Sequence, residues 1–132
     1  MRHSIRSCRR WPLHKVLGII AMLGTSNNSL AADTYHKLTD GEIKAKVTGM
    51  EISDPHFSEQ YMADGTVRIV DLGRRLRGTW KIDDDELCIE TPEPDGSRCK
   101  EIWSSGTKYQ LRIPGDPIPF DVEIQKQQVR GW

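Results

Sequence analysis

Histidine and carboxylate side chains that lie close together in the sequence are the first candidates for chemistry. His56 lies near Asp54 and Glu59, a combination of residue types that can act in acid–base catalysis or bind a metal ion. His36 is the other histidine beyond residue 31. No third residue that could complete a catalytic or metal site lies at a recognisable spacing, so we interpret these as surface residues on a loop around Pro55. An enzyme is the least favoured of three hypotheses, because it would require distant residues to converge on a histidine.

An acidic run, Asp83-Asp84-Asp85-Glu86, has the composition of a calcium site. A calcium loop needs spaced oxygen ligands, a glycine and a distant glutamate, whereas four consecutive acidic side chains cannot all face one ion. We therefore interpret the run as a solvated hairpin tip. The sequence also has no G-x-S-x-G motif and no phosphate-cradling glycine loop. We predict a protein that is not an enzyme and that has no cofactor and no metal site.

Three neighbouring arginines and several aromatic residues could contact a ligand or a partner protein. The arginines could bind a carboxylate, a phosphate or an acidic surface, although a solvated turn that protects a strand edge has the same composition. The aromatic residues recur at strand spacing, which is more typical of a core or a barrel lining than of a ligand cage. The candidate contacts are Arg74, Arg75, Arg77, Trp80, Trp103 and Tyr109.

The cysteines predict one disulfide. Cys8 lies in the N-terminal segment, which leaves Cys88 and Cys99 as an even pair in the remainder of the chain. Their spacing is not that of a C-x-x-C redox motif, and no second Cys/His pair stands at metal-ligand spacing. Both are equidistant from the dipeptide Glu93-Pro94, so we expect them to face each other on one hairpin. Closing a loop of about 12 residues would stabilise the fold by about 3 kcal/mol.

Residues 1–31 have the three parts of a secretory signal peptide. A basic stretch up to Lys15 precedes an apolar stretch at residues 16–24, which is followed by polar residues and by the small residues Ser29 and Ala31. The apolar stretch is too short for a membrane anchor, which needs about 20 apolar residues. We predict cleavage after Ala31 or Ala32 and a periplasmic or secreted protein with no membrane span after cleavage. Both general secretion and twin-arginine export remain open.

The charge balance differs between the two parts of the chain. Five of the 19 basic residues and none of the 19 acidic residues lie within residues 1–31, which leaves 14 basic and 19 acidic residues in the remainder. A nucleic-acid binder would need a basic excess to displace counterions from phosphates. An acidic domain also has no general attraction to an anionic membrane. We therefore expect no nucleic-acid partner and no membrane-surface role.

Turn signals divide the rest of the chain into one helix and several short strands. Thr39 and Glu42 have capping-box spacing, and Ile43, Val47 and Met50 recur at helical spacing, which predicts a helix over residues 40–48 ended by a glycine. Alternating apolar residues then predict strands, and the segments between them, including residues 63–65, 72–75 and 83–85, are typical of turns. The predicted strands are residues 57–62, 66–70, 76–82, 87–89, 99–103, 109–113 and 120–124.

This pattern predicts a mainly β domain over residues 32–126 with a flexible tail at residues 127–132. About seven or eight short strands at regular spacing, each followed by a turn, are typical of an antiparallel meander. Closure into a small lipocalin-like barrel removes the sheet edges, and a two-sheet sandwich is the alternative. We expect the disulfide to bridge neighbouring strands beneath the proline-rich segment at residues 91–96.

A set of short motifs resembles a group of small exported proteins of alphaproteobacteria. In this chain the motifs are LTDGEI at 38–43, YMADGT at 61–66, GTWKI at 78–82, LC at 87–88, Cys99, Gly106 and YQL at 109–111. The resemblance covers most of the chain after residue 31 and implies a secreted or periplasmic domain of unknown biochemical role, with no catalytic residues to transfer. Gly78-Thr79-Trp80 also resembles the G-x-W motif of lipocalins, although here it lies in mid-chain.

The sequence therefore favours a non-enzymatic exported domain that binds a small ligand or a protein partner. A barrel that leaves a cavity would take a small apolar ligand, framed by Trp80 and Tyr109. A structural or interaction protein of the cell envelope is the alternative, with the Arg74–Arg77 segment and the proline-rich loop as its contact surface.

Export and disulfide formation can be measured together. We expect the intact mass of the protein recovered from the periplasm or the medium to correspond to residues 32–132 or 33–132, less two hydrogens for one disulfide. Reduction should restore both hydrogens. Recovery of the complete chain with free thiols from the cytoplasm would contradict both predictions.

Overall fold

Nine strands and one helix make up residues 32–129, which is the part of the chain that the computed structural model describes. The predicted signal peptide at residues 1–31 lies outside the described residues. In chain order the elements are β1 (His36–Lys37), α1 (Asp40–Val47), β2 (Met50–Ser53), β3 (Phe57–Tyr61), β4 (Thr66–Asp71), β5 (Arg74–Asp83), β6 (Glu86–Glu90), β7 (Ser97–Ser105), β8 (Lys108–Arg112) and β9 (Phe120–Lys126).

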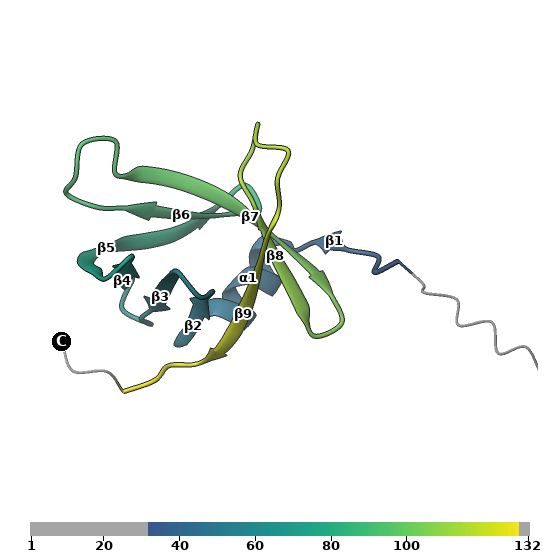
Figure 1. Ribbon diagram of the computed structural model, residues 1–132, viewed down its shortest axis with the longest axis horizontal. Coiled ribbons are helices and arrows are strands. Elements are labelled where there is room, and N and C mark those ends of the chain that lie inside the picture. Colours follow the sequence, from purple (N-terminus) through teal and green to yellow (C-terminus); the bar gives the residue numbers. More distant parts are fainter. Residues whose placement is uncertain (1–31, 130–132) are drawn as a thin grey trace, which may run out of the picture. The chain divides into compact units, whose positions relative to one another are not determined.

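Eight of these strands form a closed antiparallel barrel (Figure 1). Each strand from β2 to β8 pairs with the next one in the sequence, and β9 returns to pair with β2, where Ile124 lies opposite Ile52. The short β1 pairs with β7 beyond the point where β6 begins. The predicted meander with one short N-terminal helix is therefore confirmed, and the sheet closes because β9 meets β2.

The core follows from the alternation of side chains along each strand. One face of every barrel strand points inward, so that Val67 and Ile69 of β4 and Leu87 and Ile89 of β6 are buried. Together with α1 they form one continuous apolar core. The outward residues of the same strands are largely polar, as the pattern in the sequence predicts.

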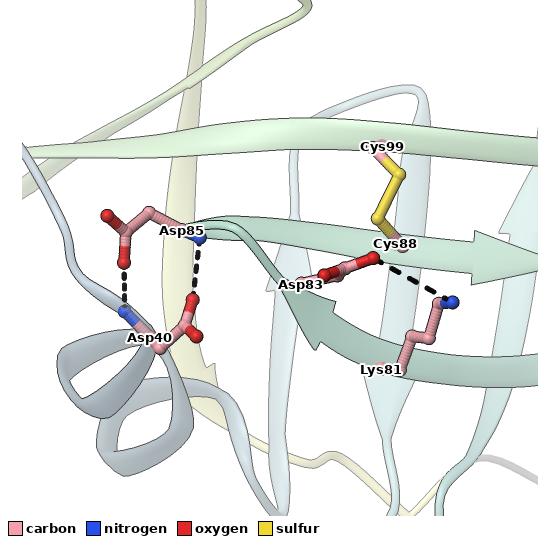
Figure 2. The surroundings of a disulfide bond; sticks show 6 residues. All are labelled: Asp40, Lys81, Asp83, Asp85, Cys88 and Cys99. Atoms are coloured by element: carbon pink, nitrogen blue, oxygen red, sulfur yellow. Dashed lines mark hydrogen bonds and ion pairs between the residues drawn. A yellow bond between two sulfur atoms is a disulfide. The ribbon is translucent and has the colours of Figure 1, made fainter.

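Helix α1 packs against β2, β5 and β6, where Ile43 and Val47 are fully buried. Its first residue is tied to the β5–β6 turn by two reciprocal hydrogen bonds (Figure 2): the Asp40 amide donates to Asp85 Oδ1 at 2.7 Å, and the Asp85 amide donates to Asp40 Oδ1 at 2.6 Å. The helix thus covers the end of the barrel at which β5 ends. Within residues 32–129, no helix combines the length and the apolar character needed to cross a bilayer.

Strand β2 is missing from the sequence prediction. We counted Met50 with the apolar residues of the helix, but the helix ends at Val47 and Met50 is the first residue of β2. Gly49 adopts a φ of 75°, a conformation that favours glycine and lets the chain turn sharply from helix to strand. With only four residues, β2 carries too little periodicity to be recognised without its partners β3 and β9.

Arg74 and Arg75 are the first residues of β5, so the predicted turn at residues 72–75 is too long. Only Leu72 and Gly73 form the turn, with φ values of 46° and 82°. A two-residue turn with both φ values positive has the twist that joins two antiparallel strands most directly. The strand therefore begins two residues earlier than the sequence suggested.

The predicted cross-strand disulfide is confirmed. Cys88 of β6 lies directly opposite Cys99 of β7, with their Cα atoms 4.0 Å apart, and the two sulfurs are bonded (Figure 2). Cys88 points away from the inward-facing Leu87 and Ile89, so the bond lies on the outer side of the barrel wall. It joins the two strands that flank the proline-rich β6–β7 loop.

The first residues of the predicted tail contact the barrel. The Gln127 side chain donates to the carbonyl oxygens of Tyr61 at 3.3 Å and Met50 at 3.4 Å, and the Gln60 side chain donates to the Gln128 carbonyl at 3.1 Å. The structure therefore holds the chain against β2 and β3 just after β9 ends. Residues 130–132 lie outside the described residues.

Replacement of Gly78 by alanine should destabilise the barrel. A Cβ at this position of β5 would lie 2.1 Å from the Glu90 carbonyl oxygen, so the backbone of β6 would have to move. We expect a loss of about 1–3 kcal/mol in the free energy of unfolding, measured by urea denaturation. Gly41→Ala is the matched control, since nothing lies within 4 Å of its Cβ position and alanine favours helix α1. Equal stability of the two variants would contradict this account of Gly78.

Candidate functional site

The end of the barrel opposite α1 contains a pocket. Phe57 begins β3, Asp71 ends β4 and Phe120 begins β9, so these inward positions meet at the end where β5 starts. A cavity of about 260 Å³ opens between them. Its lining has the apolar residues Phe57, Ile69, Ile113 and Phe120, the charged residues Glu59, Asp71, Arg98 and Lys100, and the disulfide residue Cys99.

Glu59 lies inside the barrel and accepts hydrogen bonds from three side chains. The Tyr61 hydroxyl donates to Oε2 at 2.5 Å, the Lys100 ammonium forms a close ion pair with the same oxygen, and Arg98 Nη2 lies 3.4 Å from Oε1. The side chains of Glu59 and Lys100 are almost fully buried, whereas that of Arg98 is half exposed. The ion pair therefore lies at the inner side of the pocket, and Arg98 links it to the opening.

Side chains alternate between the two faces of a strand, and this alternation along β3 and β7 brings these groups together. Glu59 and Tyr61 are inward-facing neighbours on β3, and Arg98 and Lys100 are inward-facing neighbours on β7. Strands β3 and β7 do not pair with each other, so the contact runs across the barrel interior. Lys100 also lies over the Phe57 ring, with Nζ 5.8 Å from the ring centroid.

Our interpretation of Glu59 as a surface loop residue is wrong. It occupies an inward position between Phe57 and Tyr61, where the alternation by itself predicts a core residue. Its charge led us to place it on the surface, because charged residues are rarely buried without a partner. The partner Lys100, with Arg98 beside it, follows 41 residues later, and its role has no signal in the local sequence.

The charges in this cluster depend on one another. Burial by itself would raise the pKa of Glu59, but the charge of Lys100 and the hydrogen bonds from Lys100 and Tyr61 outweigh it and lower that pKa below its ordinary value of 4.5. Burial lowers the pKa of Lys100, and Glu59 opposes that shift. Burial also raises the pKa of the Tyr61 hydroxyl, with Glu59 adding to the effect. Near neutral pH the cluster holds an ionised carboxylate that faces cationic and hydroxyl donors.

The histidines do not join this cluster. His56 is exposed, and Asp54 Oδ1 accepts the backbone amides of His56 at 2.6 Å and Phe57 at 2.8 Å, which shapes the β2–β3 turn. His36 is exposed on β1. Of the side chains considered for acid–base chemistry, His56 and Asp54 therefore lie at the β2–β3 turn, whereas Glu59 lies in the barrel interior.

The acidic run lies at the β5–β6 turn, as predicted, but only Asp84 and Asp85 form the turn, since Asp83 ends β5 and Glu86 begins β6. Asp84 and Asp85 have φ values of 53° and 57°, and Asp85 is hydrogen-bonded to α1. Glu86 lies beside the disulfide, within a cluster whose ligand atoms are less than 4.8 Å apart. Because the two sulfurs are bonded to each other, they are not the thiolates that a metal ion would require.

The three arginines do not face one common surface. Arg74 Nη1 lies 3.0 Å from Glu93 of the β6–β7 loop, and Arg74 Nη2 lies 4.0 Å from Asp71. Arg75 and Arg77 are exposed and, by the alternation of β5, point outward. A role of these arginines in binding a partner stays a prediction.

The three aromatic candidates also have separate surroundings. Trp80 points inward at the α1 end, where its Nε1 donates to the Met62 carbonyl at 2.8 Å and its ring meets the edge of Tyr61. Trp103 lies on the outer wall, and Arg112 Cζ lies 3.9 Å from the centroid of its ring. Lys46 Nζ lies 5.9 Å from the centroid of the Tyr109 ring. The lining of the 260 Å³ pocket includes none of the three, and their role as ligand contacts stays a prediction.

Comparison with known protein families, curated proteins and solved structures gave no match for this chain. The chemistry of the site therefore has to be argued from its own geometry. Apolar walls favour a hydrophobic ligand, and charged groups at the inner end can fix its orientation. The Lys100 side chain is held in a close ion pair with Glu59, an arrangement suited to binding by charge.

Replacement of Glu59 by glutamine should destabilise the fold strongly. The variant leaves the ammonium of Lys100 buried without its counter-charge, and breaking a buried ion pair costs about 3–5 kcal/mol. We expect a loss of this size in urea denaturation at neutral pH. Glu123→Gln, on the exposed face of β9, should change the stability by less than about 0.5 kcal/mol. A loss of equal size in both variants would refute the structural role of the ion pair.

The same variant should change the acid limb of the stability curve. The pKa of Glu59 is lower in the folded protein than in the unfolded chain, so its contribution is fully present above pH 4.5 and is lost as the pH falls through the folded value. Denaturation measured at several acidic pH values should show a steeper loss for the wild type than for Glu59→Gln. Parallel curves would mean that Glu59 does not titrate as an ion-paired group.

Proposed function

We propose that this protein is exported and that its barrel binds a small, largely apolar ligand without catalysing a reaction. The observation that carries the proposal is the 260 Å³ pocket, which has four apolar residues in its lining and opens at the end of the barrel that α1 does not cover. A preformed apolar cavity with a few polar groups that converge at one side is the usual form of a small-molecule site.

The volume of the pocket limits the size of the ligand. Sites for drug-sized molecules occupy about 300–1,000 Å³, so this pocket lies just below that range. A pocket below this range suits a ligand smaller than a drug-sized molecule. A short alkyl chain or a single aromatic ring with a polar substituent meets this limit.

The disulfide supports the proposed export. Disulfides such as Cys88–Cys99 form and persist in oxidising compartments, and they are rare in the cytosol. The signal-peptide features of residues 1–31 and the resemblance to exported alphaproteobacterial proteins agree with this assignment. A periplasmic or secreted binding protein would meet its ligand outside the cytoplasm.

A role as an interaction protein of the cell envelope is the second candidate function. The contact of Arg74 with Glu93 brings the start of β5 beside the proline-rich β6–β7 loop, so the two segments expected to form a contact surface are neighbours. Leu72, which is 78% exposed, adds an apolar side chain to the same end of the barrel. This surface could serve a protein partner whether or not the pocket is occupied.

A charge placed in the apolar wall should weaken ligand binding. Octanol is a suitable uncharged probe, and Ile113→Asp should bind it at least about tenfold more weakly than the wild type, because the ligand would desolvate the new carboxylate. Isothermal titration calorimetry measures the dissociation constants. Ile118→Asp is the control, since Ile118 is 64% exposed on the same β8–β9 segment and is not part of the pocket lining. Equal binding by the two variants would place the ligand elsewhere.

A further inference from the structure

The charged groups of the pocket are unequal in number at its inner end. Lys100 and Arg98 are two cations that share the single carboxylate of Glu59. Asp71 is the other carboxylate in the lining. On β4 it is the next inward-facing residue after Ile69, nearer the open end of the barrel. Its carboxylate lies 4.0 Å from Arg74, which also pairs with Glu93. Arg74 is therefore one cation shared by two carboxylates at the rim, whereas at the inner end two cations share the one carboxylate of Glu59.

The two inner cations also have unused hydrogen-bond donors. An ammonium group has three N–H donors and a guanidinium group has five. Within residues 32–129, the hydrogen bonds of the Lys100 and Arg98 side chains go to Glu59 alone. The Arg98 contact is long, at 3.4 Å, and half of this side chain is exposed towards the opening. A ligand group could therefore take the free donors of Arg98 without breaking the buried pair.

We infer that the ligand is a small amphiphile with an apolar tail and one carboxylate, whose head pairs with Arg98 beside Lys100. The inference rests on the proposed function and specifies its ligand class. The tail would lie between Phe57, Ile113 and Phe120, and the head would supply the negative charge that the inner end lacks. A planar carboxylate matches the two parallel donors that a guanidinium presents.

The size of the charge excess favours a carboxylate over a phosphate monoester. Two cations share one carboxylate at the inner end, whereas a phosphate monoester carries close to two negative charges at neutral pH. Glu59 and Asp71 would repel the second charge from positions in the same pocket. A single carboxylate can accept the free donors of Arg98 and leaves the Glu59–Lys100 pair intact.

The test compares octanoate with octanol on the protein as the cell produces it. The two probes share an alkyl chain and differ in the charged head, so titration calorimetry at neutral pH isolates the contribution of the carboxylate. We expect the wild type to bind octanoate about tenfold more tightly than octanol, the effect of one charge-assisted contact. Arg98→Gln should lose that preference and keep its affinity for octanol. The half-exposed position of Arg98 makes this variant compatible with folding.

A second variant separates a specific contact from a general effect of charge. Lys81→Gln removes one positive charge from the exposed outer wall of β5 and should retain the full preference for octanoate. Equal affinity of the wild type for both probes, or a preference that survives in Arg98→Gln, would overturn the inference while the proposed function stands. If the wild type binds neither probe, the proposed function fails, and the inference fails with it.

Discussion

The pairing of β9 with β2 is the constraint on which the rest of this structure depends. Seven of the eight barrel strands are connected to the next by a local turn, and such a meander could lie open as a sheet with two exposed edges. When Ile124 meets Ile52, the sheet closes and one face of every strand becomes an interior. Because of that closure, the alternate residues Phe57, Glu59 and Tyr61 of β3 point into the barrel interior. The closure also makes β3 and β7 face each other across the barrel.

The closed interior has two different ends. At one end α1 inserts Ile43 and Val47 into the core, and the hydrogen bonds between Asp40 and Asp85 hold the helix there. At the other end the interior contains charged side chains and an open volume. A buried ion pair contributes little net stability compared with a well-packed apolar core, because both ions must be removed from water. The Glu59–Lys100 pair is therefore not explained by its contribution to stability alone.

The disulfide and the pocket share one strand. Cys99 is the residue between Arg98 and Lys100, so its side chain points outward where theirs point inward. The bond to Cys88 fixes the outer side of β7 against β6 at the level where its inner side supplies both cations. A covalent link on the outer wall therefore limits the movement of the charged groups relative to the rest of the barrel. The chemistry of the pocket and the stability of the wall depend on the same short segment.

The sequence by itself determined those features that depend on neighbouring residues. Turn residues such as Asp64-Gly65, the alternation of apolar side chains, the start of α1 and the facing positions of Cys88 and Cys99 all follow from local geometry. Only the tertiary structure decided that residues 50–53 form a strand and that Glu59 is buried against Lys100. The physical reason is that a short strand and a buried charge are stable only with their partners, and those partners lie far away in the chain and meet only when the barrel closes.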